Sequence, residues 1–112
     1  MSDSRLATHM LAGALIRQVQ DAGGFATVLH RGDPTSGVIL LQCLEKGQHK
    51  GFFERMADMK GGYHLVACGP SDASETQETS EYIARRRRSD PDLWLIELDV
   101  AQAERLAAMT LC

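Results

Sequence analysis

Hydrophobic residues near the start of the chain recur at intervals of three and four, which is the period of one face of an α-helix. The positions on this face are Leu11, Ala12, Leu15, Ile16, Val19 and Ala22. Asp3 or Ser4 is expected to cap the helix, because either side chain can accept a hydrogen bond from an unpaired backbone amide. Gly23 and Gly24 follow the pattern, and glycine readily adopts the left-handed conformation that ends a helix.

The next part of the chain has the short apolar runs and the turn residues that are typical of β-strands. Four strands are predicted, at Phe25–His30, Gly37–Leu44, Gly51–Met56 and Tyr63–Cys68. Asp-Pro in the loop Arg31–Gly37, and glycines in the later loops 45–50 and 58–62, indicate turns between them. Because short turns join consecutive strands, we expect an antiparallel meander.

The last third of the chain begins with a second helical segment. Asp72 and Glu75 have the spacing of a capping box, and the helix is expected to run to about Arg88. The segment Ser89–Asp92 contains a proline and ends the helix, because the residue before a proline avoids the helical region. Leu93–Leu98 then predicts a fifth strand, with apolar residues on both of its faces.

A third helix is predicted after Asp99, whose side chain is expected to cap it. The apolar face of this helix consists of Val100, Ala103, Leu106 and Ala107. The predicted order of elements is therefore α-β-β-β-β-α-β-α. This order indicates an α+β protein with a mostly antiparallel sheet of about five strands and three helices, and we expect the helices to cover one face of the sheet.

The length and composition of the chain narrow the class of protein further. The 112 residues, 44% of them hydrophobic, predict a single globular domain over residues 1–112. The longest aliphatic run is far shorter than the ~20 residues of a membrane span, and the first ten residues lack the order of a signal peptide. Three widely spaced cysteines do not indicate a disulfide framework. We therefore expect a cytoplasmic protein without membrane contact.

Three segments of the chain carry a resemblance to a known family. They are RGDPTSG at 31–37, FERMADMKGGY at 53–63 and RRRRSDPDLWLIELD at 85–99. In order and spacing, over about residues 5–105, the chain resembles a set of small, largely alphaproteobacterial proteins, number 1491 in the domain-of-unknown-function series. The resemblance implies a compact bacterial cytoplasmic protein. It implies no activity, and no catalytic residue follows from it.

The four consecutive arginines Arg85–Arg88 are the most unusual feature of the sequence. The net charge is −3, so the protein has no overall field that would attract a phosphate backbone. Acidic residues occupy the front of the same predicted helix, at Asp72, Glu75, Glu78 and Glu81. Acidic residues near the start of a helix and basic residues near its end both interact favourably with the helix dipole. Glu81 also has the i, i+4 spacing to pair with Arg85. We expect the arginines to be neutralised within their own segment; the alternative is a patch for an anion or an acidic partner.

Seven residues are candidates for a ligand site: Arg31, Asp33, Arg85, Arg88, Asp90, Asp92 and Trp94. Asp90 and Asp92 are typical of a turn, and the alternative is a pair of metal-binding or general-base carboxylates. We expect the Trp94 ring to be buried and to anchor the hydrophobic core; the alternative is an exposed ring that contacts a partner. The spacing of His and Cys predicts no metal site, and no glycine-rich phosphate loop is present. We expect neither a metal nor a cofactor.

The sequence favours a non-enzymatic protein–protein interaction module, with a homodimer as one form of that contact. It contains no coherent catalytic constellation, and the N-terminal helix is apolar over more than a narrow stripe, which indicates a partner. The alternative is a phosphate-directed enzyme or a nucleic-acid-binding module that uses Arg85–Arg88 with Asp90 and Asp92. The negative net charge argues against nucleic acid as the partner.

Overall fold

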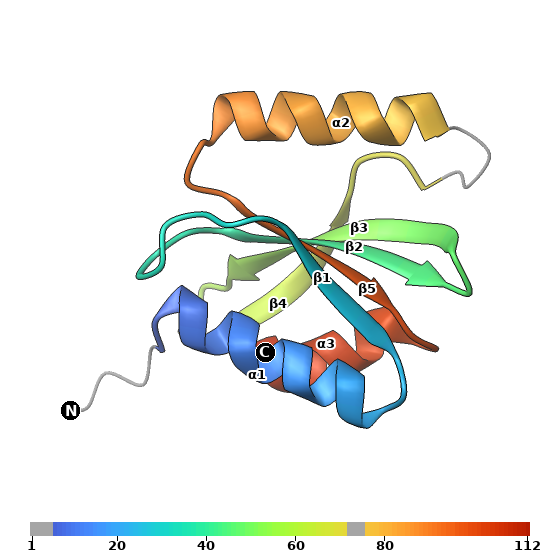
Figure 1. The fold of residues 1–112 in the computed structure, drawn as a ribbon. Helices are drawn as coiled ribbons and strands as arrows, with labels where there is room; N and C mark the ends of the chain where they lie inside the picture. Colours follow the sequence, from blue (N-terminus) through green and yellow to red (C-terminus); the bar gives the residue numbers. More distant parts are fainter. Residues whose placement is uncertain (1–5, 72–75) are drawn as a thin grey trace.

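The computed structural model of the chain describes residues 6–71 and 76–112 and contains one five-stranded sheet with helices on both of its faces (Figure 1). The helices within these residues are α1 (Thr8–Asp21), α2 (Thr76–Ser89) and α3 (Ala103–Leu111). The strands are β1 (Phe25–His30), β2 (Ile39–Glu45), β3 (Gln48–Ala57), β4 (Tyr63–Cys68) and β5 (Trp94–Asp99). The predicted α+β class and the predicted order of elements are confirmed. In the described part of the chain, no helix is long and apolar enough to cross a membrane.

The strands lie in the order β1-β5-β2-β3-β4. Only β2, β3 and β4 form the predicted antiparallel meander, because β5 lies between β1 and β2. β5 pairs with β1 in the antiparallel direction and with β2 in the parallel direction. The prediction that β1 pairs with β2 is therefore wrong, and the sheet is mostly antiparallel with one parallel pair.

The strand order follows from the polarity of the two strands involved. β5 has apolar side chains on both faces, with Trp94 and Ile96 in one core and Leu95 in the other, and each is about 1% exposed or less. Such a strand is buried completely only in the interior of a sheet. β1 alternates between exposed and half-buried residues, which is the pattern of an edge strand with one covered face.

The helices divide between the two faces of the sheet, as Figure 1 shows, so the expectation that they cover one face is wrong. α1 and α3 pack on one face and enclose the larger core, which includes Leu15 and Ala107. α2 lies on the opposite face, where Tyr82 and Ile83 pack over Leu40 and Phe52. A sheet that is apolar on both faces needs cover on both, and α2 supplies the second layer despite its charged composition.

The loop between β1 and β2 caps the start of α1. The backbone amides of Thr8 and His9 donate to the carbonyl oxygens of Thr35 (3.1 Å) and Pro34 (2.9 Å). The Thr8 hydroxyl donates to the Gly37 carbonyl at 2.9 Å. The first amides of a helix have no partner within the helix, so these bonds from a distant loop replace a capping side chain. They also fix α1 against that loop.

The capping residues predicted from the sequence have a mixed outcome. Those that lie outside the described residues are Asp3, Ser4, Asp72 and Glu75. The prediction for Asp99 is wrong, because its carboxylate accepts the backbone amides of Lys46 (2.8 Å) and Gly47 (2.9 Å). Lys46 and Gly47 have φ of 54° and 82°, the left-handed conformation of a tight hairpin turn, and Asp99 pins that turn to the end of β5.

Candidate functional site

Five of the seven predicted site residues meet where the loop 31–37 docks on the turn that leads into β5. The backbone amide of Asp33 donates to the Asp92 carbonyl at 2.9 Å, and the indole Nε1 of Trp94 donates to the Asp33 carbonyl at 2.7 Å. The Trp94 amide donates to the Val38 carbonyl at 2.8 Å. Two backbone hydrogen bonds and the Trp94 indole join segments about 60 residues apart in this way, and we call this contact the loop lock (residues 31–38 with 90–94).

Two glycines allow the close approach of the two backbones. A Cβ atom at Gly32 would lie 2.0 Å from the Asp92 carbonyl oxygen, and one at Gly37 would lie 2.5 Å from the same atom. Backbone atoms cannot move aside as the end of a flexible side chain can. The loop lock therefore requires glycine at both positions.

The Asp33 side chain is used within its own loop. Its carboxylate accepts the Ser36 amide (2.7 Å), the Thr35 amide (3.1 Å) and the Ser36 hydroxyl (3.1 Å). These bonds, led by the Ser36 amide, hold the pKa of Asp33 below its usual value. The carboxylate is therefore ionised at neutral pH, and its hydrogen-bonding capacity is directed at the turn.

Asp90 and Asp92 serve the turn on the other side of the loop lock. Asp90 Oδ1 accepts the Asp92 amide at 3.1 Å, and the Asp90 carbonyl accepts the Leu93 amide at 3.1 Å. Asp92 contributes its backbone carbonyl to the lock, as described above. Among the described residues, no three His, Cys, Asp or Glu side chains lie close enough to hold one metal ion.

Trp94 is buried, with only 1% of its surface exposed, so its ring is not available to a partner. The guanidinium of Arg31 lies 5.2 Å from the centre of that ring, in cation–π geometry. Arg31 and Trp94 are both predicted site residues and contact each other, but the contact covers the core rather than opening it to a ligand.

The four arginines of α2 point in different directions, because successive helical residues lie ~100° apart. Arg86 Nη2 pairs with Glu54 of β3 at 2.6 Å, and its Nη1 donates to the Tyr82 hydroxyl at 2.7 Å. No other ion pair is present in residues 6–71 and 76–112. The predicted pairing of Arg85 with Glu81 is absent, and Arg85 instead lies 5.6 Å from the Tyr82 ring. Among the described residues, the one ion pair of these arginines joins α2 to β3, at Arg86, and none forms with Glu78 or Glu81; the other two predicted partners, Asp72 and Glu75, lie outside the described residues.

Arg87 and Arg88 are exposed and line a shallow hollow of about 460 Å³ together with His30 and Pro91. His30 is fixed there by a 2.6 Å hydrogen bond between its Nδ1 and the Leu93 carbonyl. Of the predicted site residues, Arg88 is the one that this hollow contains. The sequence missed His30 as its neighbour, since only the docking of β1 beside β5 brings the two together.

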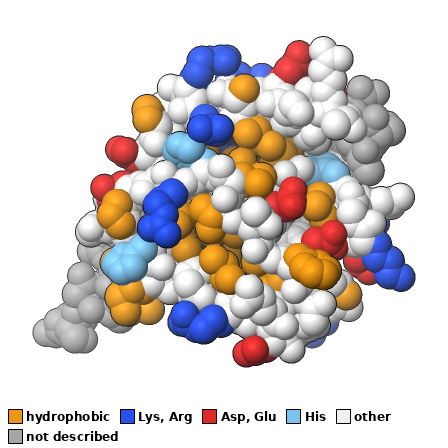
Figure 2. Space-filling model, in the orientation of Figure 1, with side chains coloured by type: hydrophobic (Ala, Val, Ile, Leu, Met, Phe, Trp, Pro, Cys, Tyr) orange, Lys and Arg blue, Asp and Glu red, His pale blue; other side chains and the backbone are white. Residues whose placement is uncertain are grey.

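β1 forms one edge of the sheet and carries exposed apolar side chains. Phe25 is 74% exposed and Leu29 is 43% exposed. Figure 2 shows the face on which β1 lies in front, and hydrophobic side chains gather across the middle of this face, below α2. The pairing of β1 with β5 is regular from Phe25 to Val28 and shifts by one residue before His30.

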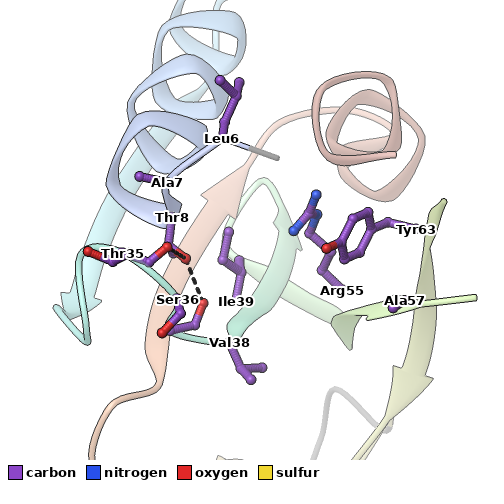
Figure 3. Close-up of a pocket in the computed structure, with 11 residues that line it drawn as sticks. Leu6, Ala7, Thr8, Thr35, Ser36, Val38, Ile39, Arg55, Ala57 and Tyr63 are labelled. Carbon is purple, nitrogen blue, oxygen red and sulfur yellow. Dashed lines mark hydrogen bonds between the residues drawn. The ribbon is translucent and has the colours of Figure 1, made fainter. Parts of the chain in front are cut away.

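A larger pocket of about 650 Å³ opens beside the first turn of α1 (Figure 3). We call it the Arg55 pocket; it is lined by Leu6, Thr35, Ser36, Ile39, Arg55 and Tyr63, among others. Arg55 Nε donates to the Leu111 carbonyl at 2.7 Å, and its guanidinium lies 3.5 Å from the centre of the Tyr63 ring. None of the seven predicted site residues lines this pocket.

The buried cysteine of the larger core is not a nucleophile at neutral pH. Cys43 is 2% exposed, and burial, with a smaller contribution from the Glu104 charge, raises its pKa to about 12. A thiol in this state packs as a small hydrophobic residue.

The sequence profile of the family described as "Protein of unknown function (DUF1491)" matches residues 6–108. The chain belongs to the DUF1491 family. This confirms the resemblance carried by the three segments at 31–37, 53–63 and 85–99. The first and third of these segments contain the loop lock, so part of the resemblance is explained by a structural contact. A comparison with curated proteins gave no match.

Solved structures of DUF1491 proteins share the fold. A crystal structure of a DUF1491 family protein from Caulobacter crescentus CB15 is 26% identical, covers 91% of this chain and 94% of that chain, and has a TM-score of 0.78. An NMR structure of a DUF1491 family protein from Caulobacter crescentus CB15 has a TM-score of 0.75 at the same identity, with 90% and 91% covered. A structural-genomics solution structure from A. tumefaciens has a TM-score of 0.69 at 26% identity and covers 88% of each chain. The DUF1491 name assigns no activity, so function has to be argued from this site.

The unequal roles of the arginines can be tested by alanine substitution. Arg86→Ala removes the bonds to Glu54 and Tyr82 and leaves a half-buried carboxylate without its partner, so the free energy of unfolding should fall by ~1.5–3 kcal/mol. Arg85→Ala, at an exposed position of the same helix, should change it by less than about 0.5 kcal/mol. Urea unfolding followed by tryptophan fluorescence measures both. Equal losses in the two variants would contradict the assignment of Arg86 as the neutralised arginine.

Proposed function

We propose that this DUF1491 protein is a non-enzymatic protein-interaction module of the cytoplasm, and that it works as a homodimer joined through β1. One observation carries the proposal: β1 is an edge strand with Phe25 and Leu29 exposed. An edge strand presents unpaired backbone groups, and proteins commonly protect such edges with charges, proline or a covering element. Residues 25–29 contain neither a charge nor a proline.

The other edge of the sheet differs in its exposed side chains. Each edge strand packs against a helix, β1 against α1 and β4 against α3, but the exposed residues of β4 are His64 and Ala67, which are polar or small. The apolar edge is therefore confined to β1. This asymmetry favours one specific contact over open-ended association along both edges of the sheet.

A second copy is the occupant that the charges favour. A strand pairs with itself in the antiparallel direction about a two-fold axis, so the same patch serves both copies. In this antiparallel pairing of two β1 strands, the end of β1 that carries His30 and Arg31 in one copy lies beside the start of β1 in the other copy. Asp21 and Asp99 lie near that start. Opposite charges at both ends of the pairing favour this orientation.

The hydrogen bonds of the predicted carboxylates support a non-enzymatic role. Asp33 and Asp90 direct their side chains at backbone amides of their own turns. A general base needs a free carboxylate within reach of a substrate proton. Asp33 Oδ2 and Asp90 Oδ1 are each occupied by an amide of their own turn.

The homodimer is tested by sedimentation equilibrium. The native protein should sediment with twice the 12.3 kDa mass of the chain, and Phe25→Lys should raise the dissociation constant at least about tenfold, because a charge would enter the paired edge. Met59→Lys is the matched control, since Met59 is exposed but lies in the turn before β4 and should leave the dimer unchanged.

Either of two results would contradict the homodimer. One is a native protein that stays at the mass of a single chain up to about 1 mM. The other is a Phe25→Lys variant that dimerises as strongly as the native protein. Because Phe25 is 74% exposed, the substitution is not expected to disturb folding, and a dispersed NMR spectrum would verify this.

The second candidate function is a phosphate-directed enzyme or nucleic-acid module, and the hollow beside His30, Arg87 and Arg88 is the observation that favours it. The homodimer account predicts no saturable binding of a short single-stranded oligonucleotide, even at about 50 mM salt, because the net charge is −3. Fluorescence anisotropy measures this. Salt-dependent binding that is lost in Arg87→Ala with Arg88→Ala, and kept in Arg105→Ala, would replace the leading function with the second one.

A further inference from the structure

The Arg55 pocket has the size and the mixed lining of a small-molecule site. Its volume of about 650 Å³ lies within the ~300–1,000 Å³ that is typical of ligand pockets. Its walls come from four separate parts of the fold: the start of α1, the loop after Thr35, the start of β2, and the paired ends of β3 and β4. Figure 3 shows these walls around a common space, with Arg55 and Tyr63 on the side opposite Thr35 and Ser36.

Two contacts fix the orientation of the Arg55 side chain before any ligand binds. Its Nε–H donates to the Leu111 carbonyl at the end of α3, and the plane of its guanidinium rests on the Tyr63 ring. These contacts use one of the five N–H groups and one face of the guanidinium. Within residues 6–71 and 76–112, the two Nη atoms donate no hydrogen bond, and Arg55 has no carboxylate partner. A fixed cation with a free planar edge is suited to a carboxylate, which it binds through two parallel hydrogen bonds.

The remaining lining is part apolar and part polar, and some of its polar groups are already hydrogen-bonded. Leu6, Ile39 and Ala57 contribute aliphatic surface, whereas the Val38 side chain points away from the pocket, into the core under α2 (Figure 3). The Thr8 hydroxyl donates to the Gly37 carbonyl, the bond drawn in Figure 3, and the Ser36 hydroxyl donates to Asp33. Beyond Arg55, the pocket therefore offers an aliphatic wall together with the side chains of Thr35 and Tyr63.

We propose that the Arg55 pocket binds a small monocarboxylate with a short aliphatic body. The carboxylate pairs with the Nη atoms of Arg55, and the aliphatic body lies along Leu6 and Ile39. One guanidinium balances one negative charge, whereas a phosphate dianion would leave charge unpaired in a pocket with a single cation. Because Arg55 is already ordered by Leu111 and Tyr63, binding loses little side-chain entropy.

Hexanoate is the probe for this site, and backbone amide chemical shifts measured during an NMR titration give the readout. The native protein should show saturable shifts at the amides of Ser36, Val38 and Arg55, with a dissociation constant in the millimolar range or tighter. Hexanol, which lacks the charge, and inorganic phosphate, which lacks the aliphatic body, should each bind at least about tenfold more weakly.

Three variants separate the contribution of Arg55 from a general loss of structure. Arg55→Gln should weaken hexanoate binding at least about tenfold, and Arg105→Gln, an exposed arginine of α3, should leave it unchanged. Ala57→Phe fills the pocket from its rim without removing the guanidinium, and it should also abolish the shifts. Dispersed spectra of the free variants show that they fold.

The proposal is overturned by any of four results. They are the absence of saturable shifts with hexanoate, equal binding of hexanol, stronger binding of inorganic phosphate, and a folded Arg55→Gln variant that binds hexanoate as the native protein does. The pocket involves none of the residues of β1, so failure of the homodimer would leave this proposal intact, and the converse also holds.

Discussion

The fold depends on the contact between the loop 31–38 and the turn 90–94. β5 comes from the last part of the chain but lies in the middle of the sheet, between β1 and β2. The loop that joins β1 to β2 must therefore pass over the entry of β5, and it does so in direct backbone contact, with the Asp33 amide on the Asp92 carbonyl. The same loop caps α1 and forms one wall of the Arg55 pocket. One contact thus sets the strand order, the position of a helix and the shape of a cavity.

The secondary structure was predictable because local signals determine it. Hydrophobic periodicity, glycine turns and the proline after Ser89 located all three helices and all five strands in the correct order. The pairing of the strands was harder to predict from the sequence, because it depends on which strands have apolar side chains on both faces and therefore need a core on each side of the sheet. Leu93–Leu98 is apolar on both faces, and the burial of both faces between β1 and β2 outweighs the preference of β1 and β2 to pair through their short loop.

The candidate site was predictable only in part, for a related physical reason. Arg31, Asp33, Asp90, Asp92 and Trp94 do lie together, but their groups are used in turns, in the core and in the lock. The acidic residues that precede the arginines in the sequence suggested pairing within the helix, whereas Arg86 pairs with Glu54 of the neighbouring strand β3. The Arg55 pocket could not be predicted from the sequence, because its lining residues form no local motif and come together only when β3, β4 and α1 have packed. Contacts of this kind are set by topology and not by a local motif.

The most direct test of the central contact is the stability of Gly32→Ala, measured by urea unfolding beside Gly13→Ala. The new Cβ at residue 32 would lie 2.0 Å from the Asp92 carbonyl oxygen, so the free energy of unfolding should fall by at least about 2 kcal/mol. At residue 13, within α1, the nearest atom is the end of a flexible arginine at 3.4 Å, and alanine should be neutral or stabilise the protein by up to about 1 kcal/mol. A Gly32→Ala protein as stable as the native one would show that the sheet does not depend on the loop lock.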